Sequence, residues 1–569
     1  MSIPGMRRAA IGLTALAVTA FGAVATTPDQ ADAGPKPVDV TLLALNDFHG
    51  NLEPPTGSSG SIAGQPAGGA EYLATHLAEL RRTVQKKNVI TVAAGDLIGA
   101  SPLLSAAFHD EPTIEALSMA GLDYASVGNH EFDEGSDELL RIQNGGCHPV
   151  DGCADGTPYE GAGFQYLSAN AFVTQTGAPL LPPYAIHKAD DDVKIGFIGM
   201  TLEGTPEIVS PQGVAGLQFT DEAETANRYA RELRRKGVET IVVLLHEGGT
   251  QAGAGGINDC VGFTGPVVDI ANRMDPSIDV IVSGHTHQAY NCEINNKLVT
   301  SASSFGRLVT DIDLKIDPRT GDVLTATAEN VVVTRTVAKD PAQTELINRY
   351  KGVLGPVAGR QVGTTTEAIT RTQETLFGTT RGESPLGNLI GDAQLWATDD
   401  EQGAVAAFMN PGGVRADLDA GPVTYEEAFT VQPFANNLVT LDLTGAQLFC
   451  MLEQQFVTGR VLYPSSTVRY VVDPAGTTAP ATDPCAGTRV VRGSLAFGGV
   501  PVETGATYRI TVNNFLAGGG DGFSVLTGGR NLVTGQIDLD AFVAYLTANS
   551  PVSGPALDRI RLTTEAPAA

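Results

Sequence analysis

The chain has 569 residues, too many for one hydrophobic core, so two domains are the default expectation. Hydrophobic residues make up 42% of it, with Gly and Pro spread throughout, which is ordinary globular composition. A formal net charge of −28 argues against non-specific binding of nucleic acid, because phosphate backbones need a basic face. An anionic substrate therefore needs a locally positive site, such as a metal ion or placed arginines.

The N-terminus has the pattern of a targeting segment. Arg7 and Arg8 precede an apolar run over 9–25, and small residues at 23–25 and 31–33 offer cleavage sites. We predict a signal peptide over 1–33; an uncleaved anchor is the alternative, because the run is slightly long. No other stretch of the sequence is long and apolar enough to span a membrane. The mature protein is expected to be secreted, extracellular or in the cell envelope, without stable membrane insertion.

Six cysteines suit an oxidising compartment. None of them lies in a Cys-x-x-Cys motif, so thiol catalysis and a zinc knuckle are not expected. Pairing them in chain order, one of several open connectivities, gives Cys147–Cys153, Cys260–Cys292 and Cys450–Cys485.

Apolar runs alternate with amphipathic stretches between residues 38 and 335. Runs such as VTLLALND and TIVVLLHEG are typical of buried strands, and segments with helical spacing at 70–85 and 221–237 lie between them. This alternation predicts a layered α/β domain over 38–335, with central strands buried on both faces. A polar helix over 339–356, bounded by prolines, is predicted to link it to a second region over 360–562.

Five of the predicted strands end in side chains that bind metals, usually beside a glycine. In α/β sheets ligands bind at the carboxyl ends of strands, so these ends are expected to converge. Any one motif alone is more simply a capped turn, but their joint appearance predicts a metal site. The seven candidate ligands are Asp47, His49, Asp96, Asn129, His246, His285 and His287.

The mixture of Asp, His and Asn suits divalent ions such as Zn, Mn, Fe or Co. Seven candidates are too many for one tetrahedral ion, so we expect two ions about 3.5–4 Å apart, bridged by a carboxylate. Such a pair holds a hydroxide at neutral pH and binds a phosphoryl group for in-line attack.

The order D-x-H, G-D, G-N-H-E-x-x-D, H-E and G-H-T-H resembles that of the calcineurin-like metallophosphoesterases, and the exported two-domain form resembles the bacterial 5′-nucleotidase family. The resemblance covers nearly the whole mature chain. It implies a four-layered α/β/β/α N-terminal metallophosphoesterase domain and a C-terminal α+β nucleotide-binding domain, joined by a helix. It also implies how the ligands divide: Asp47, His49 and His287 on the first ion, Asp96 bridging, and Asn129, His246 and His285 on the second.

The same resemblance gives His130 a catalytic role without making it a ligand. It would contact the phosphoryl group or protonate the leaving oxygen, and Asp133 would orient it. A carboxylate partner fixes the tautomer of the imidazole and raises its pKa. A helix N-cap is a second, compatible role for Asp133.

Three segments of the second region, 410–415, 432–437 and 513–523, resemble the substrate-binding domain of the 5′-nucleotidases. By that resemblance Phe434 and Phe515 would sandwich the base, with stacking worth roughly 1–3 kcal/mol each; core packing is the alternative. Asp521 would accept hydrogen bonds from the ribose hydroxyls. Asn410 would contact the base and Arg415 the phosphate.

A further phosphate ligand is harder to assign. The family often places arginines shortly before its LGN segment, and Arg381 is the candidate here, but its spacing from Gly387 departs from that pattern. Arg371 is the substitute.

These patterns predict an exported dinuclear-metal phosphohydrolase that acts on nucleoside 5′-monophosphates and related nucleotides, with no nucleic acid and no obligate protein partner required. The alternatives are a phosphodiesterase of 2′,3′-cyclic nucleotides, nucleotide sugars or extracellular nucleic acid, and a non-catalytic surface binding protein. A nucleotide held by both domains would bridge them, so the segment 339–356 is a candidate hinge.

Overall fold

The computed structural model describes residues 36–564, apart from 57–58, 83–87, 154, 210–212, 253–254, 376–381, 435 and 481. The predicted signal peptide and Arg381 lie outside the described residues. Within the described part of the chain, no helix is long and apolar enough to cross a membrane.

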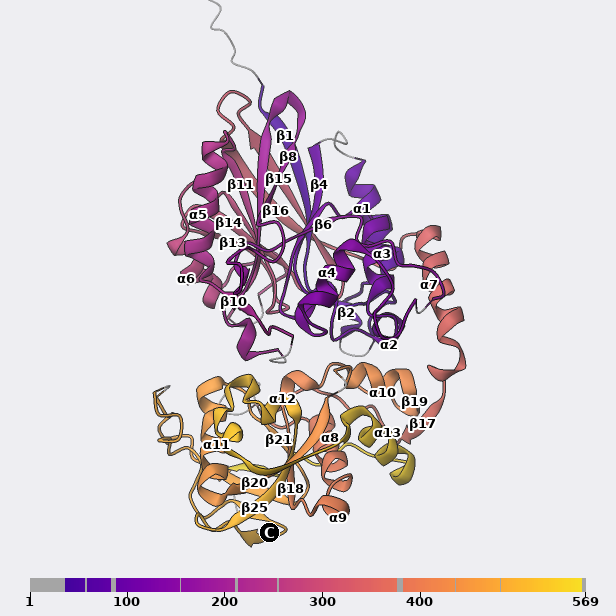
Figure 1. The fold of residues 1–569 in the computed structure, drawn as a ribbon, viewed down its shortest axis with the longest axis vertical. Helices are drawn as coiled ribbons and strands as arrows, with labels where there is room; N and C mark the ends of the chain where they lie inside the picture. The colour runs from indigo at the N-terminus through magenta and orange to yellow at the C-terminus, as the bar shows by residue number, and fades with distance from the viewer. Residues whose placement is uncertain are drawn as a thin grey trace, which may run out of the picture. The chain divides into compact units, whose positions relative to one another are not determined.

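The N-terminal domain contains two six-stranded sheets (Figure 1). In the first sheet β1, β4, β5 and β6 run parallel, and β15 and β16 extend it as antiparallel strands. Its order is β16 (Val323–Val332), β15 (Leu308–Ile316), β1 (Val38–Leu45), β4 (Val89–Ala94), β5 (Tyr124–Ser126) and β6 (Gln165–Leu167).

The second sheet also has parallel strands in its centre, but it has antiparallel strands at both edges rather than at one. Its order is β13 (Ala289–Ile294), β14 (Lys297–Ala302), β12 (Val280–Ser283), β11 (Thr240–His246), β9 (Lys194–Thr201) and β8 (Tyr184–Lys188). Short pairs flank the sheets: β2 (Ser61–Ile62) with β3 (Gln65–Pro66), and β7 (Ala171–Val173) with β10 (Leu217–Phe219).

The two sheets share one apolar interior. Leu42 and Val92 of the first sheet belong to the same buried cluster as Phe197 and Leu244 of the second. This explains why the strands read as continuous apolar runs rather than as alternating ones, since both of their faces are covered.

Helices cover the two outer faces, which gives the predicted α/β/β/α order of layers. The first sheet packs against α1 (Ala70–Arg81), α3 (Glu111–Met119), α4 (Ser136–Asn144) and α7 (Pro341–Leu354), with α2 (Leu103–Ala106) beside them. The second packs against α5 (Glu222–Arg235) and α6 (Pro266–Arg273). The expected fold class is confirmed for this domain.

The predicted linker segment contains α7. This helix buries more apolar side chains than the polar sequence of the segment indicated. The side chain of Asp340 caps its first turn by accepting hydrogen bonds from the backbone N–H groups of Ala342 and Gln343. Leu346, Ile347 and Tyr350 are buried in the core of the N-terminal domain. The helix therefore packs as part of that domain rather than standing clear as a spacer.

The C-terminal domain is built on a mixed five-stranded sheet, and its helices complete an α+β fold, as expected. The sheet order is β21 (Tyr463–Pro464), β18 (Ala406–Met409), β25 (Thr507–Asn513), β20 (Asn437–Thr444) and β26 (Arg530–Ile537). Smaller sheets pair β17 (Gln361–Thr365) with β19 (Gly421–Thr424), and order β24 (Val500–Pro501), β23 (Ala496–Phe497), β22 (Val468–Val472) and β27 (Ile560–Leu562). The helices are α8 (Pro385–Trp396), α9 (Asp399–Gln402), α10 (Tyr425–Val431), α11 (Gly445–Thr458), α12 (Asn514–Ala517) and α13 (Asp538–Asn549).

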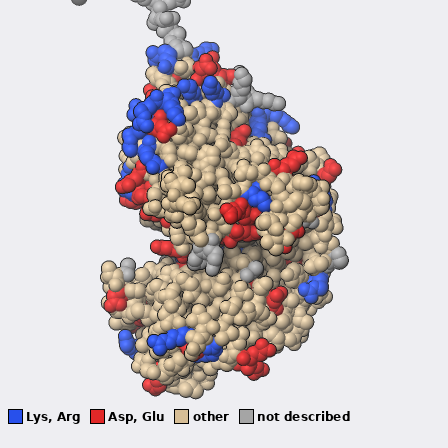
Figure 2. Space-filling view, in the orientation of Figure 1, with Lys and Arg blue, Asp and Glu red and all other residues tan. Residues whose placement is uncertain are grey.

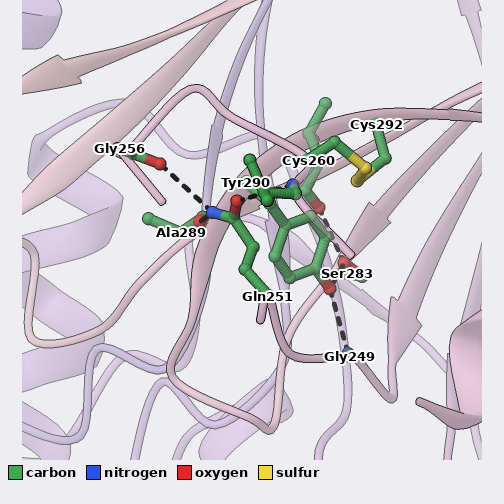
Figure 3. The surroundings of a disulfide bond; sticks show 10 residues. Gly249, Gln251, Gly256, Cys260, Ser283, Ala289, Tyr290 and Cys292 are labelled. Atoms are coloured by element: carbon green, nitrogen blue, oxygen red, sulfur yellow. Dashed lines mark hydrogen bonds between the residues drawn. A yellow bond between two sulfur atoms is a disulfide. The ribbon is translucent and has the colours of Figure 1, made fainter. Parts of the chain in front are cut away.

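All three predicted disulfides are present, so the chain-order pairing is confirmed. Cys260–Cys292 ties the loop after β11 to β13 (Figure 3). Beside it, Gln251 donates hydrogen bonds to the carbonyls of Gly256 (3.1 Å) and Ala289 (2.8 Å). The cross-link therefore fixes two segments that each begin at a strand end bearing candidate metal ligands.

Positive side chains gather at one end of the N-terminal domain, around the C-terminal end of α5 (Figure 2). Arg231, Arg234, Arg235 and Lys236 lie in or directly after that helix. In this view the region lies at the end away from the C-terminal domain.

Candidate active site

The structure brings all seven predicted metal ligands together. Asp47 and His49 follow β1, Asp96 follows β4, and Asn129 follows β5 in the first sheet. His246 ends β11, and His285 and His287 follow β12, in the second sheet. The ligand atoms fall within 4.8 Å of one another in the groups Asp47–His49–His287 and Asp96–His246–His285. Asn129 joins the second group, since its Oδ1 is 3.0 Å from His285 Nδ1.

The donor atoms are spaced and oriented for metal binding. His49 Nε2 lies 3.1 Å from His287 Nε2 and 3.6 Å from Asp96 Oδ2, and His246 Nε2 lies 3.0 Å from the same oxygen. Ligands about 2.1 Å from a tetrahedral ion are separated by about 3.4 Å, so these spacings suit divalent cations.

A hydrogen bond from the other ring nitrogen fixes which nitrogen of each histidine faces the centre. His49 Nδ1 lies 2.8 Å from the carbonyl of Gly99, and His246 Nδ1 lies 2.7 Å from that of Ala94. Carbonyl oxygens only accept, so both Nδ1 atoms carry a hydrogen, and in the neutral imidazole both Nε2 atoms present a lone pair to a metal ion. The buried Nε2 of His246 lies 3.0 Å from Asp96 Oδ2 without hydrogen-bond geometry, an arrangement that suits two ligands of one ion. The residues present therefore fit the metals that the sequence predicts.

The ligand loops combine strained backbone with a close approach at Gly128. Asp47, His49, Asp96, His285 and His287 all have positive φ, between 47° and 69°, which L-residues adopt only at a cost. A Cβ atom on Gly128 would lie only 2.2 Å from Asp96 Oδ1. Glycine is needed there because the loops after β4 and β5 approach so closely.

The surroundings shift the pKa values of the two buried aspartates in opposite directions. Burial raises the pKa of Asp47, and the neighbouring Asp96 raises it further. Burial acts in the same direction on Asp96, but His246, His130 and His49 outweigh it and hold the pKa of Asp96 well below its usual value. Asp96 lies between the two ligand groups, 3.6 Å from His49 Nε2 and 3.0 Å from His246 Nε2.

His130 and Asp133 form the predicted pair. His130 Nδ1 lies 2.8 Å from Asp133 Oδ2, and its backbone N–H donates to Asp96 Oδ1 at 2.9 Å. Burial lowers the pKa of His130, but Asp133 and Asp96 raise it more, so the net shift is upward. Asp133 does not cap α4, whose N-cap is Gly135 without a side-chain bond. The carboxylate thus serves the imidazole and not the helix.

A cleft of about 890 Å³ places this pair beside the predicted substrate residues. Both domains line it, and the ring of His130 stacks on that of Phe434 with 5.7 Å between centroids. Phe434 and Phe515 are only partly buried, and Phe515 also packs against the core of the C-terminal domain. The predicted residues in the lining are Asp96, Asn129, His130, Asp133, His285, His287, Asn410, Arg415, Phe434, Phe515 and Asp521.

The arginines lie close to the centre. The Arg415 guanidinium is 5.7 Å from the centre of the Phe434 ring. Burial, with the charge of Arg371, lowers the pKa of Arg415 to about 10, so it remains charged at neutral pH. Arg371 also lowers the pKa of His287, after burial and Arg415, and its guanidinium donates to Ser59 Oγ at 3.3 Å. Arg371 is thus near the metal ligands, whereas Arg381 lies outside the described residues.

Sequence reasoning missed two residues that organise the centre. Glu131 is buried and accepts hydrogen bonds from the backbone N–H groups of Asp96, Leu97 and Gly128, so it ties two ligand loops together. Asn46 donates to Asp47 Oδ2 and to the carbonyl of Ser303, both at 2.6 Å. Both residues adjoin predicted ligands, and their polarity inside buried segments was the available signal.

Two family models match the chain. Residues 40–289 match the calcineurin-like phosphoesterases, and residues 361–528 match the C-terminal domain of 5′-nucleotidases. The chain belongs to the calcineurin-like phosphoesterases of the two-domain 5′-nucleotidase type. This is a family of phosphoric ester hydrolases that use divalent metals.

Individual relatives of this phosphoesterase differ in their described roles. It is 35% identical to an endonuclease of Bacillus subtilis over 92% of its own length, but it spans only 41% of that relative. It is 32% identical to a cell wall protein of Listeria monocytogenes, covering 91% of this chain and 68% of the relative. Among solved structures, a 5′-nucleotidase precursor of Thermus thermophilus is 29% identical with a TM-score of 0.75, covering 93% of this chain and all of the other.

Proposed function

We propose that this phosphoesterase removes phosphate from nucleoside 5′-monophosphates and related nucleotides, using two divalent cations. One observation carries the proposal: a single cleft is lined by metal ligands and the His130–Asp133 pair from one domain, and by Phe434, Phe515 and Asp521 from the other. A nucleotide has the matching parts, namely a phosphate, a ribose and a base.

The bound cations would supply a water-derived nucleophile at neutral pH and offset the phosphoryl charge. Asp47, His49 and His287 would hold one of them and Asn129, His246 and His285 the other, with Asp96 shared. Arg415 presents a fixed fork of N–H donors for the phosphate oxygens.

His130 is placed to handle the proton of the leaving group. Its Nδ1 is occupied by Asp133, so the proton that it gives to the ribose 5′ oxygen comes from Nε2. The charge of Asp133 stabilises the imidazolium before the transfer. Phe434 and Phe515 would stack on the base and so fix the 5′ oxygen relative to His130.

Phosphate release across a panel of nucleotides tests the proposal. Activity should vanish with a chelator and return with Zn²⁺ or Mn²⁺. Asp96→Asn should lower kcat at least about 1000-fold, because the shared carboxylate is lost. Asp279→Asn is a matched control: it alters a half-buried carboxylate of the same domain, which accepts a hydrogen bond from the backbone N–H of Ile241 at 2.9 Å and does not line the cleft. Full activity in the presence of chelator, or in Asp96→Asn, would contradict the proposal.

The endonuclease relative favours a second candidate, a phosphodiesterase that cleaves nucleic acid or cyclic nucleotides. The same metal centre serves both reactions. Comparing the hydrolysis of 5′-AMP, 2′,3′-cyclic AMP and a short single-stranded DNA separates them. The net charge of −28 supports the small substrate, because a long polyanion is repelled.

We also propose that the protein acts outside the cytoplasm. Its three disulfides are typical of oxidising compartments, and a relative at 32% identity is a cell wall protein. Fractionation of cells that express the full chain tests this, and a purely cytoplasmic distribution would contradict it.

A further inference from the structure

The cleft contains a second permanent positive charge besides Arg415. Among the described residues in its lining, Arg415 and Arg460 are the only lysine or arginine side chains. Arg460 directly follows Gly459, which ends α11 in the left-handed conformation with φ of 70°. Its side chain is 42% exposed. The proposed function assigns Arg415 to the phosphate at the metal centre but gives Arg460 no role.

Arg460 belongs to a chain of polar contacts around the residue proposed to bind ribose. Its Nη1 lies 2.9 Å from Asp521 Oδ1. The other oxygen of Asp521 accepts a hydrogen bond from Asn410 Nδ2 at 3.1 Å, and Asn513 Nδ2 donates to Asn410 Oδ1 at 2.9 Å. The contact with Asp521 uses one nitrogen of a group that carries five N–H donors, so other donors of Arg460 are available in the cleft.

A counter-ion for Asp521 would not need this exposure. Where another carboxylate is about as covered as Asp521, its arginine partner is covered too: Arg559 and Arg141 are 4% and 9% exposed, beside carboxylates that are 13% and 2% exposed. Asp521 is 8% exposed, but its partner Arg460 is 42% exposed in the wall of the cleft. A partly exposed arginine in the wall of a cleft can bind an anion that enters the cleft, whereas a buried ion-pair arginine cannot.

We propose that Arg460 binds a second phosphate, carried on the 2′ or 3′ oxygen of the ribose. The inference rests on the proposed function, which puts the ribose hydroxyls at Asp521. A phosphate esterified to either ribose oxygen would lie beside that carboxylate, and the carboxylate alone would repel it. Arg460 offsets the carboxylate and offers donors to the phosphate. The substrate class is then extended to nucleoside 3′,5′- and 2′,5′-bisphosphates.

Equilibrium binding tests this without turnover. Calorimetry in EDTA would compare 5′-AMP with adenosine 3′,5′- and 2′,5′-bisphosphate, so that any repulsion at the empty metal ligands is common to all three. We expect the wild type to bind one bisphosphate at least about 10-fold more tightly than 5′-AMP. Arg460→Gln should lower that ratio by about 10- to 100-fold, the range for a hydrogen bond to a charged group. Arg460→Lys should retain part of it, because the charge remains but the fork is lost.

Arg469→Gln is the matched control. Arg469 is also exposed, at 44%, and is paired 3.3 Å from Asp558, but it does not line the cleft, so its variant should keep the wild-type ratio. Equal wild-type affinity for all three ligands, or an equal loss for all three in Arg460→Gln, would overturn the inference. Phosphate release from 5′-AMP is measured separately. If it is absent while the preference for a bisphosphate still depends on Arg460, the proposed hydrolysis is refuted and the second phosphate subsite is supported.

Discussion

The seven candidate metal ligands converge because each adjoins a strand end, and parallel strands place their carboxyl ends at one edge of a sheet. Motifs at strand ends are therefore enough to predict that these side chains lie close together. The supporting residues were not predicted, because nothing in a local pattern says that Glu131 accepts three backbone hydrogen bonds from two different loops. The substrate residues came from resemblance, and Arg460 had no signal because its partner Asp521 lies 61 positions along the chain.

Gly128→Ala tests the close approach of two ligand loops. The added methyl would lie 2.2 Å from Asp96 Oδ1, so Asp96 must move from the position in which it faces His246 and His49. We expect metal affinity and activity to fall by about 10- to 100-fold, as when a supporting residue of a metal site is lost. Metal content after dialysis and phosphate release measure this. Gly204→Ala, where a Cβ meets nothing within 4 Å, should have no effect; equal metal content in both variants would refute the explanation.

At the scale of elements, the type of most strands in the N-terminal domain followed from their apolar runs, whereas the order of the strands did not. Strand order depends on pairings such as β1 with β15, which joins residues some 270 positions apart, and no local pattern encodes these. A helix, α7 (Pro341–Leu354), occupies the predicted connector segment. Leu346, Ile347 and Tyr350 have the spacing of one helical stripe (i, i+1, i+4) and are buried against the N-terminal domain, a face that the overall polarity of the segment concealed.

Glu383 makes the junction between α8 and β27 sensitive to pH. The buried carboxyl accepts backbone hydrogen bonds from Arg559 (2.9 Å) and Ile560 (2.7 Å), and burial raises its pKa to about 7. The protonated form is therefore favoured in the folded state. Its contribution to stability is complete below the unfolded value, near 4.5, and is lost as the pH rises through about 7.

Glu383→Gln mimics the protonated acid and should remove this pH dependence. The Oδ1 atom of Asn388 has no partner among the described residues, so a reorientated Asn388 amide would accept from the new side chain. Between pH 5 and 8, we expect the stability of the variant relative to wild type to rise by on the order of 3 kcal/mol. Melting temperatures across that range measure it. A difference that stays constant with pH would show that Glu383 is ionised throughout.

At the scale of the molecule, the two domains contribute different parts of one site. Candidate metal ligands come from one domain and partly buried aromatic side chains from the other, so the cleft is complete only when both domains are present. The contacts across the cleft, His130 with Phe434 and Arg371 with Ser59, join segments about 300 positions apart. The sequence predicted both halves and a ligand that bridges them; the structure adds the direct contacts between the two domains.

Phe515→Ala tests the contribution of the C-terminal domain to substrate binding. Phe515 is the better choice, because Phe434 also stacks on His130 and its loss would disturb proton transfer. We expect KM for 5′-AMP to rise by about 10- to 100-fold, the loss of one stacking contact, with kcat changed much less. For p-nitrophenyl phosphate, which has no base to stack, KM should change less than about twofold. An equal rise for both substrates would remove the role in base binding.

Metal removal should destabilise the N-terminal domain selectively. Without cations, two buried aspartates and three histidines remain in strained backbone where the two sheets meet, with His246 beside them. Ligand binding adds stability as RT ln(1 + [L]/Kd), so saturation at about 1000 Kd adds about 4 kcal/mol to this domain. The C-terminal domain has separate cores and no predicted metal ligand, so its melting should not respond. Calorimetric scans with and without chelator test this, with Asp96→Asn as a variant in which the chelator effect should shrink. A chelator that shifts neither transition would show that the centre does not bind cations in the folded protein.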